Sequence, residues 1–435
     1  MNPPPPSTVG GRIACKPPPA RPGRHEFTMP EEMKPITNQH RIPCLKPILA
    51  LALALACPSF AQQPDVLLIS DELLKGETTP RLTAGPEATL LLDGKPFRGI
   101  GVNYFDCFLR TLKNGGDTSY DAGFATLAAK GIPFARFCAT GFWPLEMKLY
   151  QENRAEYFSR LDGVVKSAET HGIGLVPSLF WYYACVPDMV GEPMNQWANP
   201  QSKTRAWMSR YIEEVVSRYK DSPAIWMWEM GNEYSLHASL PNAAQNRPPV
   251  HPGRGTATTR SERDDLSFTD VRGIFTAFAT EVRRLDPTRL IGSGDAMPRA
   301  SAWHQHHRNS WKRDSPAQYA EMLEFVNPDP LGIISLHVYD SGRQAFAASM
   351  ELARRINKPL FVGEFGAEGV TAEQAAEFRT LLASVETNGV PLAALWVFDF
   401  GHQPQFNITA TNARSWQLDA IVEANARLRA EAGKH

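Results

Sequence analysis

Residues 226–235 read WMWEMGNEYS and combine a buried strand with a polar end. The apolar run Ala224–Trp228 is rich in strand-forming residues, and Ser222-Pro223 bounds it upstream, which predicts a buried β-strand. Gly231-Asn232-Glu233 follows, so an amide and a carboxylate come where the strand ends. Apolar and aromatic neighbours disfavour the charged form of such a carboxylate and raise its pKa, as a general acid requires.

A second stretch, residues 360–366, has the same form and reads LFVGEFG. It is again a short apolar strand that ends in a carboxylate, here Glu364. Only the fold can bring Glu233 and Glu364 together, because they are far apart in the sequence. Two carboxyl groups on either side of one sugar bond are the apparatus of glycoside hydrolysis. The plain alternative is that each glutamate is a solvated strand end.

Composition sets wide limits on the class of protein. The chain has 435 residues, 43% of them hydrophobic and 21% charged, which is globular composition with room for one large domain or two small ones. A formal net charge of −1 gives no electrostatic reason to expect nucleic acid or an anionic membrane surface as a partner. No feature of the sequence indicates an oligomer, so a monomer is our default expectation.

The N-terminal part of the chain is interpreted as targeting sequence rather than as fold. Residues 1–32 are Pro-rich and form an extension before the true start. Residues 33–61 have the basic and apolar parts of a signal peptide, with cleavage near Ala61. Its apolar run is too short to span a bilayer. A lipoprotein with Cys57 as lipid acceptor is the alternative, and in either case we expect a secreted or periplasmic protein.

Strand and helix patterns alternate after a lead-in at residues 62–88. A β-hairpin that turns at Asp93-Gly94 opens a domain over residues 89–435, and its second arm is the first barrel strand. We predict strands at 97–103, 133–137, 175–179, 224–228, 290–293, 332–337, 360–364 and 394–398. We predict helices at 120–130, 155–171, 200–219, 268–285, 316–325, 344–356, 371–388 and 418–432. Residues 236–265 and 299–315 are predicted to be long loops.

Eight strands that alternate with eight helices predict a (β/α)₈ TIM barrel. In that fold the functional residues lie at the carboxyl ends of the strands. Several polar residues fall there, namely Arg136, Asn232, Glu233, His337, Tyr339 and Glu364. An open doubly wound sheet is the alternative, but no G-x-G-x-x-G motif follows the first strand.

With these motifs in place, residues 88–432 resemble the retaining glycoside hydrolases of clan A, most closely glycoside hydrolase family 5, which contains cellulases and mannanases. The resemblance depends on W-E-x-G-N-E, which ends at Glu233, and on G-E-F-G around Glu364. It implies that Glu233 is the acid/base and Glu364 the nucleophile. It also implies that Asn232 bonds the sugar 2-hydroxyl and that Arg136 holds the nucleophile ionised.

The same resemblance implies further substrate-binding residues and no cofactor or metal. His337 and Tyr339 match the His-x-Tyr pair of strand 6. Trp396 matches the tryptophan that forms the floor of the subsite next to the scissile bond. The chain departs from the family after strand 3, where many members have a histidine and residues 180–183 read FWYY. Aromatic residues at strand ends are candidate sugar platforms, namely Tyr104, Trp143, Trp181, Tyr182, Trp303 and Trp396.

The expected reaction is double displacement on a β-linked polysaccharide or oligosaccharide of the β-mannan or β-glucan type. It requires carboxyl groups about 5–5.5 Å apart. We expect Arg136 and Tyr339 to keep the pKa of Glu364 low, and apolar neighbours to raise that of Glu233. An exo-acting β-glycosidase or a transglycosylase is an alternative, since the two long loops could close one end of a cleft. A non-catalytic carbohydrate-binding barrel is another.

Each supporting residue also has a plain structural interpretation. Arg136 could be part of a buried ion pair, His337 a satisfied strand-end histidine and Trp396 barrel filling. Glu229 lies on the same side of its strand as Glu233 but deeper, and we interpret it as a buried, paired structural carboxylate. The histidines at 304, 306 and 307 suggest a metal site, which the expected class does not need. Cys107, Cys138 and Cys185 allow at most one disulfide, and buried free thiols are the alternative.

Overall fold

The structure is a computed structural model, and it describes residues 82–339, 345–368 and 370–432. The expected extension at 1–32, the signal peptide at 33–61 with its cleavage near Ala61, and the lipid acceptor Cys57 lie outside the described residues. So does most of the lead-in at 62–88. Among the helices that the structure describes, none combines the length and the apolar character needed to cross a membrane.

Eight parallel strands form one sheet in the order β8-β7-β6-β5-β4-β11-β10-β9. The pairing of β11 with β4 joins the last strand to the first, so the sheet curls into a nearly closed barrel, and the predicted TIM barrel is confirmed. The strands are β4 (Gly99–Asn103), β5 (Phe134–Cys138), β6 (Gly174–Phe180), β7 (Met227–Gly231), β8 (Leu290–Gly292), β9 (Ile334–Val338), β10 (Leu360–Phe365) and β11 (Leu392–Leu395).

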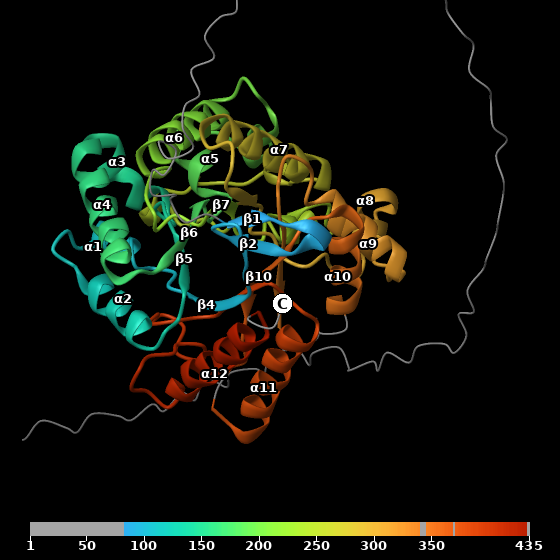
Figure 1. The fold of residues 1–435 in the computed structure, drawn as a ribbon. Coiled ribbons are helices and arrows are strands. Elements are labelled where there is room, and N and C mark those ends of the chain that lie inside the picture. Colours follow the sequence, from blue (N-terminus) through green and yellow to red (C-terminus); the bar gives the residue numbers. More distant parts are fainter. Residues whose placement is uncertain (1–81, 340–344, 369, 433–435) are drawn as a thin grey trace, which may run out of the picture. The chain divides into compact units, whose positions relative to one another are not determined.

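The main helices surround the strands, and helices that follow one another in the chain also follow one another round the ring (Figure 1). They agree with the predicted helices to within a few residues. They are α2 (Ser119–Ala129), α4 (Arg154–His171), α6 (Lys203–Tyr219), α7 (Phe268–Leu285), α9 (Pro316–Phe325), α10 (Ala345–Ile356), α11 (Ala372–Thr387) and α12 (Ser415–Ala432).

The barrel has a seam between β8 and β9, which stand at the two ends of the strand order. One backbone hydrogen bond crosses it, from Gly332 N–H to the Ile291 carbonyl at 3.0 Å. The buried side chain of Asn327 also bridges it, because its Oδ1 accepts the N–H of Ser335 at 3.0 Å and the hydroxyl of Ser293 at 3.2 Å. A side chain therefore supplies part of what a strand ladder supplies elsewhere.

The N-terminal hairpin differs from its prediction. Its turn is at Asp93-Gly94 as expected, with φ of 52° and 72°, but the second arm stops early. Strand β2 (Leu90–Leu92) pairs with β3 (Lys95–Pro96) and, on its other side, with β1 (Leu82–Ala84), and β4 is separate. One more bond follows Pro96, from the Phe97 N–H to the Leu90 carbonyl at 2.8 Å, and from Gly99 onward the chain pairs with β11 instead.

Short helices occupy several connections. The expected loop at 299–315 contains α8 (Ala302–Arg308), so that prediction was wrong, and the face of α8 that carries His304 is buried. The insert at 236–265 has only short 3₁₀ turns: η4 (Tyr234–His237), η5 (Ala243–Gln245), η6 (Pro252–Arg254) and η7 (Glu262–Asp264). The other short elements are α1 (Leu109–Lys113), α3 (Lys148–Glu152), α5 (Cys185–Val190), η1 (Pro86–Ala88), η2 (Pro144–Met147) and η3 (Met194–Ala198).

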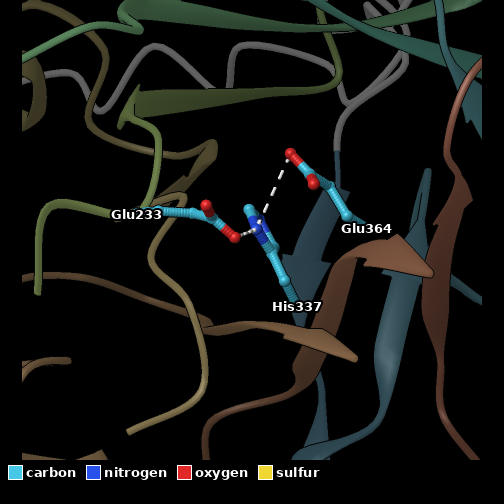
Figure 2. A group of neighbouring side chains, drawn as sticks. All are labelled: Glu233, His337 and Glu364. Carbon is cyan, nitrogen blue, oxygen red and sulfur yellow. Dashed lines mark hydrogen bonds and ion pairs between the residues drawn. The ribbon is translucent and has the colours of Figure 1, made fainter. Parts of the chain in front are cut away.

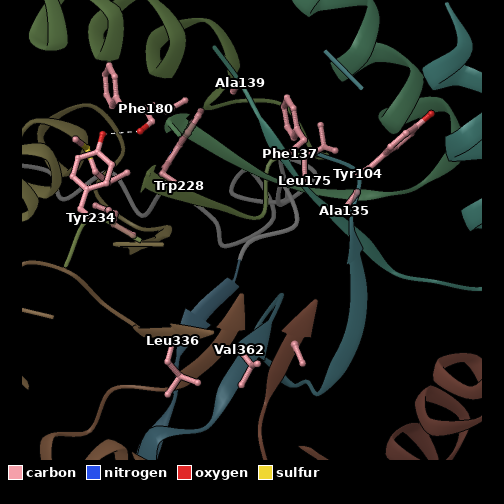
Figure 3. Packing of buried hydrophobic residues seen from close by; sticks show 14 of the residues in the cluster. Tyr104, Ala135, Phe137, Ala139, Leu175, Phe180, Trp228, Tyr234, Leu336 and Val362 are labelled. Carbon is pink, nitrogen blue, oxygen red and sulfur yellow. Dashed lines mark hydrogen bonds between the residues drawn. The ribbon is translucent and has the colours of Figure 1, made fainter. Parts of the chain in front are cut away.

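Side-chain alternation along β5 explains how charge enters the barrel. Ala135 and Phe137 belong to the main core between strands and helices, which Figure 3 shows from close by. Phe134 belongs to a second apolar cluster with Leu82, Leu90 and Met227. Successive side chains of a strand point to opposite faces. Arg136 therefore lies inside the barrel, on the same side as Phe134.

Candidate active site

Glu233 lies just after β7, in the turn that leads into η4. Its backbone is left-handed, with φ 56° and ψ 33°, a conformation that is uncommon for residues other than glycine. Backbone hydrogen bonds hold the turn, from Asn232 N–H to the Trp181 carbonyl and from Glu233 N–H to the Gly294 carbonyl, both at 3.1 Å. The turn directs the Glu233 side chain, which is 29% exposed, toward His337 (Figure 2).

Glu364 lies near the end of β10, and both of its carboxylate oxygens are bonded. Its Oε1 accepts a hydrogen bond from Arg136 Nη1 at 3.0 Å, and its Oε2 accepts one from the Tyr339 hydroxyl at 2.7 Å. The side chain is only 6% exposed. These two contacts fix the plane of the Glu364 carboxylate and so hold the group in one orientation.

His337, on β9, lies between the two glutamates (Figure 2). Its Nδ1 is 2.9 Å from Glu233 Oε1 and 3.6 Å from Glu364 Oε1. One carboxylate oxygen of Glu233 and one of Glu364 lie within 4.8 Å of each other. The fold thus brings together two carboxyl groups that the sequence holds far apart.

Arg136 is fully buried and bonds through all five of its N–H donors. Nε donates to Glu229 at 2.7 Å, and Nη1 donates to Asn103 and to Glu364, each at 3.0 Å. Nη2 donates to Asn232 Oδ1 at 2.8 Å and to the Gly231 carbonyl at 3.4 Å. This guanidinium therefore joins four barrel strands or their ends at one point.

Burial raises the pKa of both Glu233 and Glu364 above the ordinary value. The charge of Arg136 opposes this at Glu233, whereas His337, Arg136 and the Tyr339 hydroxyl oppose it at Glu364. The expectation that Glu364 has a low pKa is therefore wrong for the free site, because burial outweighs the opposing groups. The hydrogen bonds from Arg136 and Tyr339 favour the charged form of Glu364, and the hydrogen bond from His337 favours that of Glu233.

His337 is neutral at pH 7, because burial lowers its pKa to about 4. The neutral ring must then carry its proton on Nδ1 to donate to the Glu233 carboxylate. Its Nε2 has no hydrogen-bond partner and packs against Gly363, where a Cβ would be 2.9 Å away. The other expected polar residue, Asn232, uses its Oδ1 for Arg136, so its amide nitrogen is directed away from that charge.

The structure separates the expected sugar platforms. Trp396 lies at the site with 8% of its surface exposed, and its Nε1 donates to Gln403 at 2.8 Å. Trp181 lies beside it, but it is only 4% exposed and packs against the Arg136 guanidinium, 4.2 Å from its ring centre. Trp181 therefore supports Arg136 and has little ring surface left for a sugar.

Tyr104 is placed in the core rather than at the substrate, so its assignment as a substrate-binding residue was wrong (Figure 3). Its side chain is fully buried against Phe124 and Phe398, at ring distances of 5.5 and 5.0 Å. A Cβ on Gly123 would be 2.2 Å from its hydroxyl, so the ring packs directly on α2. The residue follows Asn103, which points inward, and the alternation of side chains therefore turns Tyr104 outward.

The remaining aromatic candidates pack against other rings. Phe142 stacks on Tyr182 and contacts Phe105, which contacts Trp181, so this series of rings leads outward from Arg136. Trp143 continues the series and meets the insert, where the Arg254 guanidinium lies 4.8 Å from its ring. Trp303 packs against His304 and His307 on α8 instead.

The metal alternative at the α8 histidines receives no support from the contacts. His304 bonds Asp314 at 2.7 Å, and His307 is 3.7 Å from Glu321, so the two rings meet different acids. Among the residues that the structure describes, the group with suitably close ligand atoms is Glu233, His337 and Glu364. The guanidinium of Arg136 already neutralises Glu364 there, and it would repel a metal cation.

Other structural expectations have clear outcomes. Glu229 is fully buried and paired with Arg136, as its position on the strand predicted. Cys107, Cys138 and Cys185 are buried free thiols, so the alternative without a disulfide holds. Two polar residues of the site were not singled out from the sequence, namely Asn103 and Asp295. Their positions could have indicated them, because each residue comes where a predicted strand ends.

Comparison with known proteins identifies the class. A model of the family described as cellulase (glycosyl hydrolase family 5) matches residues 92–399. The chain therefore belongs to glycosyl hydrolase family 5, and the resemblance seen in the sequence is confirmed. Mannan endo-1,4-β-mannosidase A of Podospora anserina is 41% identical over 81 residues, 17% of this chain and 21% of that protein. The chain thus matches about a fifth of the length of such curated relatives.

Solved structures share the fold. The endo-1,4-β-mannanase from Rhizomucor miehei has a TM-score of 0.56 at 16% identity, over 79% of this chain and 99% of that one. A glycoside hydrolase family 5 mannosidase from the same organism has a TM-score of 0.58 at 13% identity, over 82% of this chain and 99% of that one. At these identities the likeness shows the barrel architecture alone.

Proposed function

We propose that the protein hydrolyses β-1,4-linked mannan or its oligosaccharides with retention of anomeric configuration. The observation that carries the proposal is the approach of Glu233 and Glu364, whose nearest oxygens lie within 4.8 Å in a family 5 barrel. Retaining enzymes have carboxyl groups about 5–5.5 Å apart, and inverting enzymes about 6.5–9.5 Å. The printed names of the relatives favour mannan, and β-glucan is the alternative substrate.

In the first step Glu364 attacks the anomeric carbon while Glu233 protonates the leaving glycosidic oxygen. Arg136 and Tyr339 hold the attacking carboxylate in one plane at 3.0 and 2.7 Å. Burial raises the pKa of Glu233, which favours its protonated form, whereas hydrogen bonds from Arg136 and Tyr339 favour the charged form of Glu364. The amide nitrogen of Asn232 is the candidate donor to the sugar 2-hydroxyl.

In the second step Glu233 removes a proton from water, which attacks the glycosyl–enzyme ester. Formation of the ester removes the charge of Glu364, so the pKa of Glu233 falls and its carboxylate becomes available as a base. The ring of His337 donates to Glu233 through Nδ1 at 2.9 Å, which stabilises this carboxylate form. The same pair of residues thus serves both steps, because the charge of one sets the protonation of the other.

Replacement of the nucleophile tests this mechanism directly. Glu364→Ala should lose hydrolysis of an aryl β-mannobioside by several orders of magnitude, because no ester can form. Azide should restore turnover and give the α-configured glycosyl azide, read by NMR. Glu233→Ala is the matched control, since azide should then attack the intact ester and give the β-configured azide. Products of inverted configuration from the unmutated protein would refute double displacement.

Product sizes distinguish the remaining candidates. On β-mannan, β-glucan, xylan and aryl glycosides, an endo-acting enzyme releases a range of oligosaccharides, whereas an exo-acting enzyme releases one short product from chain ends. Products longer than the substrate would indicate transglycosylation. Binding of mannan without any product, in a protein whose Glu364→Gln variant binds equally well, would identify a non-catalytic binding barrel and overturn the proposal.

We also propose that the signal peptide directs export of the protein and is removed in the process. Polysaccharide cannot enter a cell intact, so an enzyme that cuts it must meet it outside the cytoplasm. N-terminal sequencing of the protein recovered from producing cells should read from about residue 62. Retention of residues 33–61 on the recovered protein would contradict export by this route, and a lipid on Cys57 would favour the lipoprotein alternative.

A further inference from the structure

The segment that leaves β8 holds the turn that carries Glu233 at several backbone groups. The Gly294 carbonyl accepts the N–H of Glu233 at 3.1 Å. Asp295 Oδ1 accepts the N–H of Ser235 at 3.0 Å, and Arg299 donates to the carbonyl of the same serine. Ser235 is thus bonded at both its N–H and its C=O, from one neighbouring segment.

The segment after β8 approaches the end of β7 so closely that position 294 must be glycine. Gly294 has φ +67°, and a Cβ there would be 1.9 Å from the Gly231 carbonyl oxygen. The same Cβ would be 2.7 Å from the carboxyl carbon of Glu229. The turn at Glu233 is therefore packed backbone against backbone, which lets hydrogen bonds set its conformation.

Asp295 is an unusual residue for a buried contact of this kind. It is fully buried, and its Oδ1 accepts the N–H of Ala296 at 2.9 Å as well as that of Ser235. Its Oδ2 is buried without a hydrogen-bond partner. Burial raises the pKa of Asp295 to about 7, and the charge of Glu233 adds to this. A half-satisfied buried carboxyl is costly, and the two chemical steps above do not use it.

We propose that Asp295 is a positioning residue for Glu233, because its bond to Ser235 keeps the left-handed turn that aims the acid/base carboxyl at the leaving oxygen. The left-handed conformation is strained for residues other than glycine and persists only where its surroundings impose it. Loss of the Asp295 acceptor leaves the Ser235 N–H unpaired and lets the turn relax. This inference rests on the proposed function, in which Glu233 donates a proton.

The test compares two leaving groups in Asp295→Ala, Asp295→Asn and the unmutated protein. Cleavage of a 2,4-dinitrophenyl β-mannobioside needs no proton from an acid, whereas cleavage of a phenyl β-mannobioside does. In Asp295→Ala, kcat/KM for the phenyl substrate should fall on the order of tenfold or more relative to that for the dinitrophenyl substrate. Asp295→Asn keeps an acceptor for Ser235 and should restore the ratio to within about threefold of its original value.

A matched control and a structural readout separate positioning from general loss of stability. Asp286 is also a buried aspartate, but it bonds Trp228 and Arg289 at the start of β8, so Asp286→Asn should lower Tm and leave the leaving-group ratio unchanged.

A crystal structure of Asp295→Ala should show Glu233 outside the left-handed region. An unchanged φ at Glu233, or an equal fall for both substrates, would overturn the inference. Failure of the unmutated protein to cleave any aryl glycoside would instead refute the proposed function, and the crystal structure would still test the turn.

Discussion

At the scale of single residues, Arg136 shows how one side chain organises the site. Its five N–H donors reach Glu229, Asn103, Glu364, Asn232 and the Gly231 carbonyl, so the ends of several strands share one cation. A buried charge is tolerable only when it is paired and fully bonded. Glu229 supplies a second carboxylate at 2.7 Å, so Arg136 is shared between this structural partner and Glu364.

His337 gives a prediction about stability and pH. Its pKa is about 4 in the folded protein, whereas 6.5 is its ordinary value, so the unfolded chain takes up a proton first as pH falls. Stability from this residue is therefore fully present above pH 6.5 and is lost between pH 6.5 and 4. The loss should be on the order of 3 kcal/mol. Urea unfolding at pH 7 and pH 4 measures it.

The variant His337→Asn isolates this effect. Asparagine keeps an N–H donor near the position of Nδ1 but does not titrate, so its unfolding free energy should depend less on pH over that window. Glu233 and Glu364 have raised pKa values and act in the opposite direction, but they are present in both proteins and largely cancel in the difference. The same pH dependence in both proteins would show that His337 is not held neutral by burial.

At the scale of elements, the insert at 236–265 is held in place with little regular structure of its own. Arg260 forms a bidentate pair with Asp188 on α5, at 2.6 and 2.7 Å, and both side chains are nearly inaccessible. The Arg254 guanidinium lies over Trp143, and Gly255 packs against Pro144. A few contacts of charged side chains thus hold the insert in place, as backbone hydrogen bonds between strands hold the barrel.

We predict that Asp188→Ala releases the insert while the barrel stays folded. Removing the carboxylate leaves the buried Arg260 with two backbone carbonyls and the more distant carboxylate of Asp264, which should cost on the order of 3 kcal/mol locally. Limited trypsin digestion read by mass spectrometry should then cut at Arg247, Arg254 or Arg260 long before the barrel. Asp162→Ala is the control, because its pair with Arg218 is exposed and worth little. Equal resistance of both variants would contradict this role.

At the scale of the whole barrel, closure depends on side chains at the seam between β8 and β9. Asn327→Ala should expose the Ser335 N–H and the Ser293 hydroxyl to a cavity without partners, and it should lower the free energy of unfolding by about 1–3 kcal/mol. Hydrogen exchange should become faster in β9. Asn425→Ala is the control, because Asn425 bonds Ile100 on β4 at 2.8 Å in the same manner. It should cost similar stability and leave exchange in β9 unchanged.

Much of the architecture could be predicted from the chain because its information is local. The apolar run before Glu233 and its counterpart before Glu364 mark two strands, and the helix pattern at 268–285 coincides with α7. The prediction that the second hairpin arm is also the first barrel strand was wrong. A strand pattern does not show that Pro96 ends one sheet and Gly99 begins another. The α8 helix was missed because a cluster of His and Trp residues has no clear apolar period.

By itself, the sequence determined the alternation of strands and helices and the positions of two carboxylates at strand ends, because hydrophobic period and strand ends are properties of neighbouring residues. Only the tertiary structure decided that Tyr104 faces α2, that Trp181 covers Arg136, and that Asp295 bonds the turn after β7. These contacts join residues from different strands. Burial and charge at such a point depend on every segment that reaches it, and no single segment carries that information.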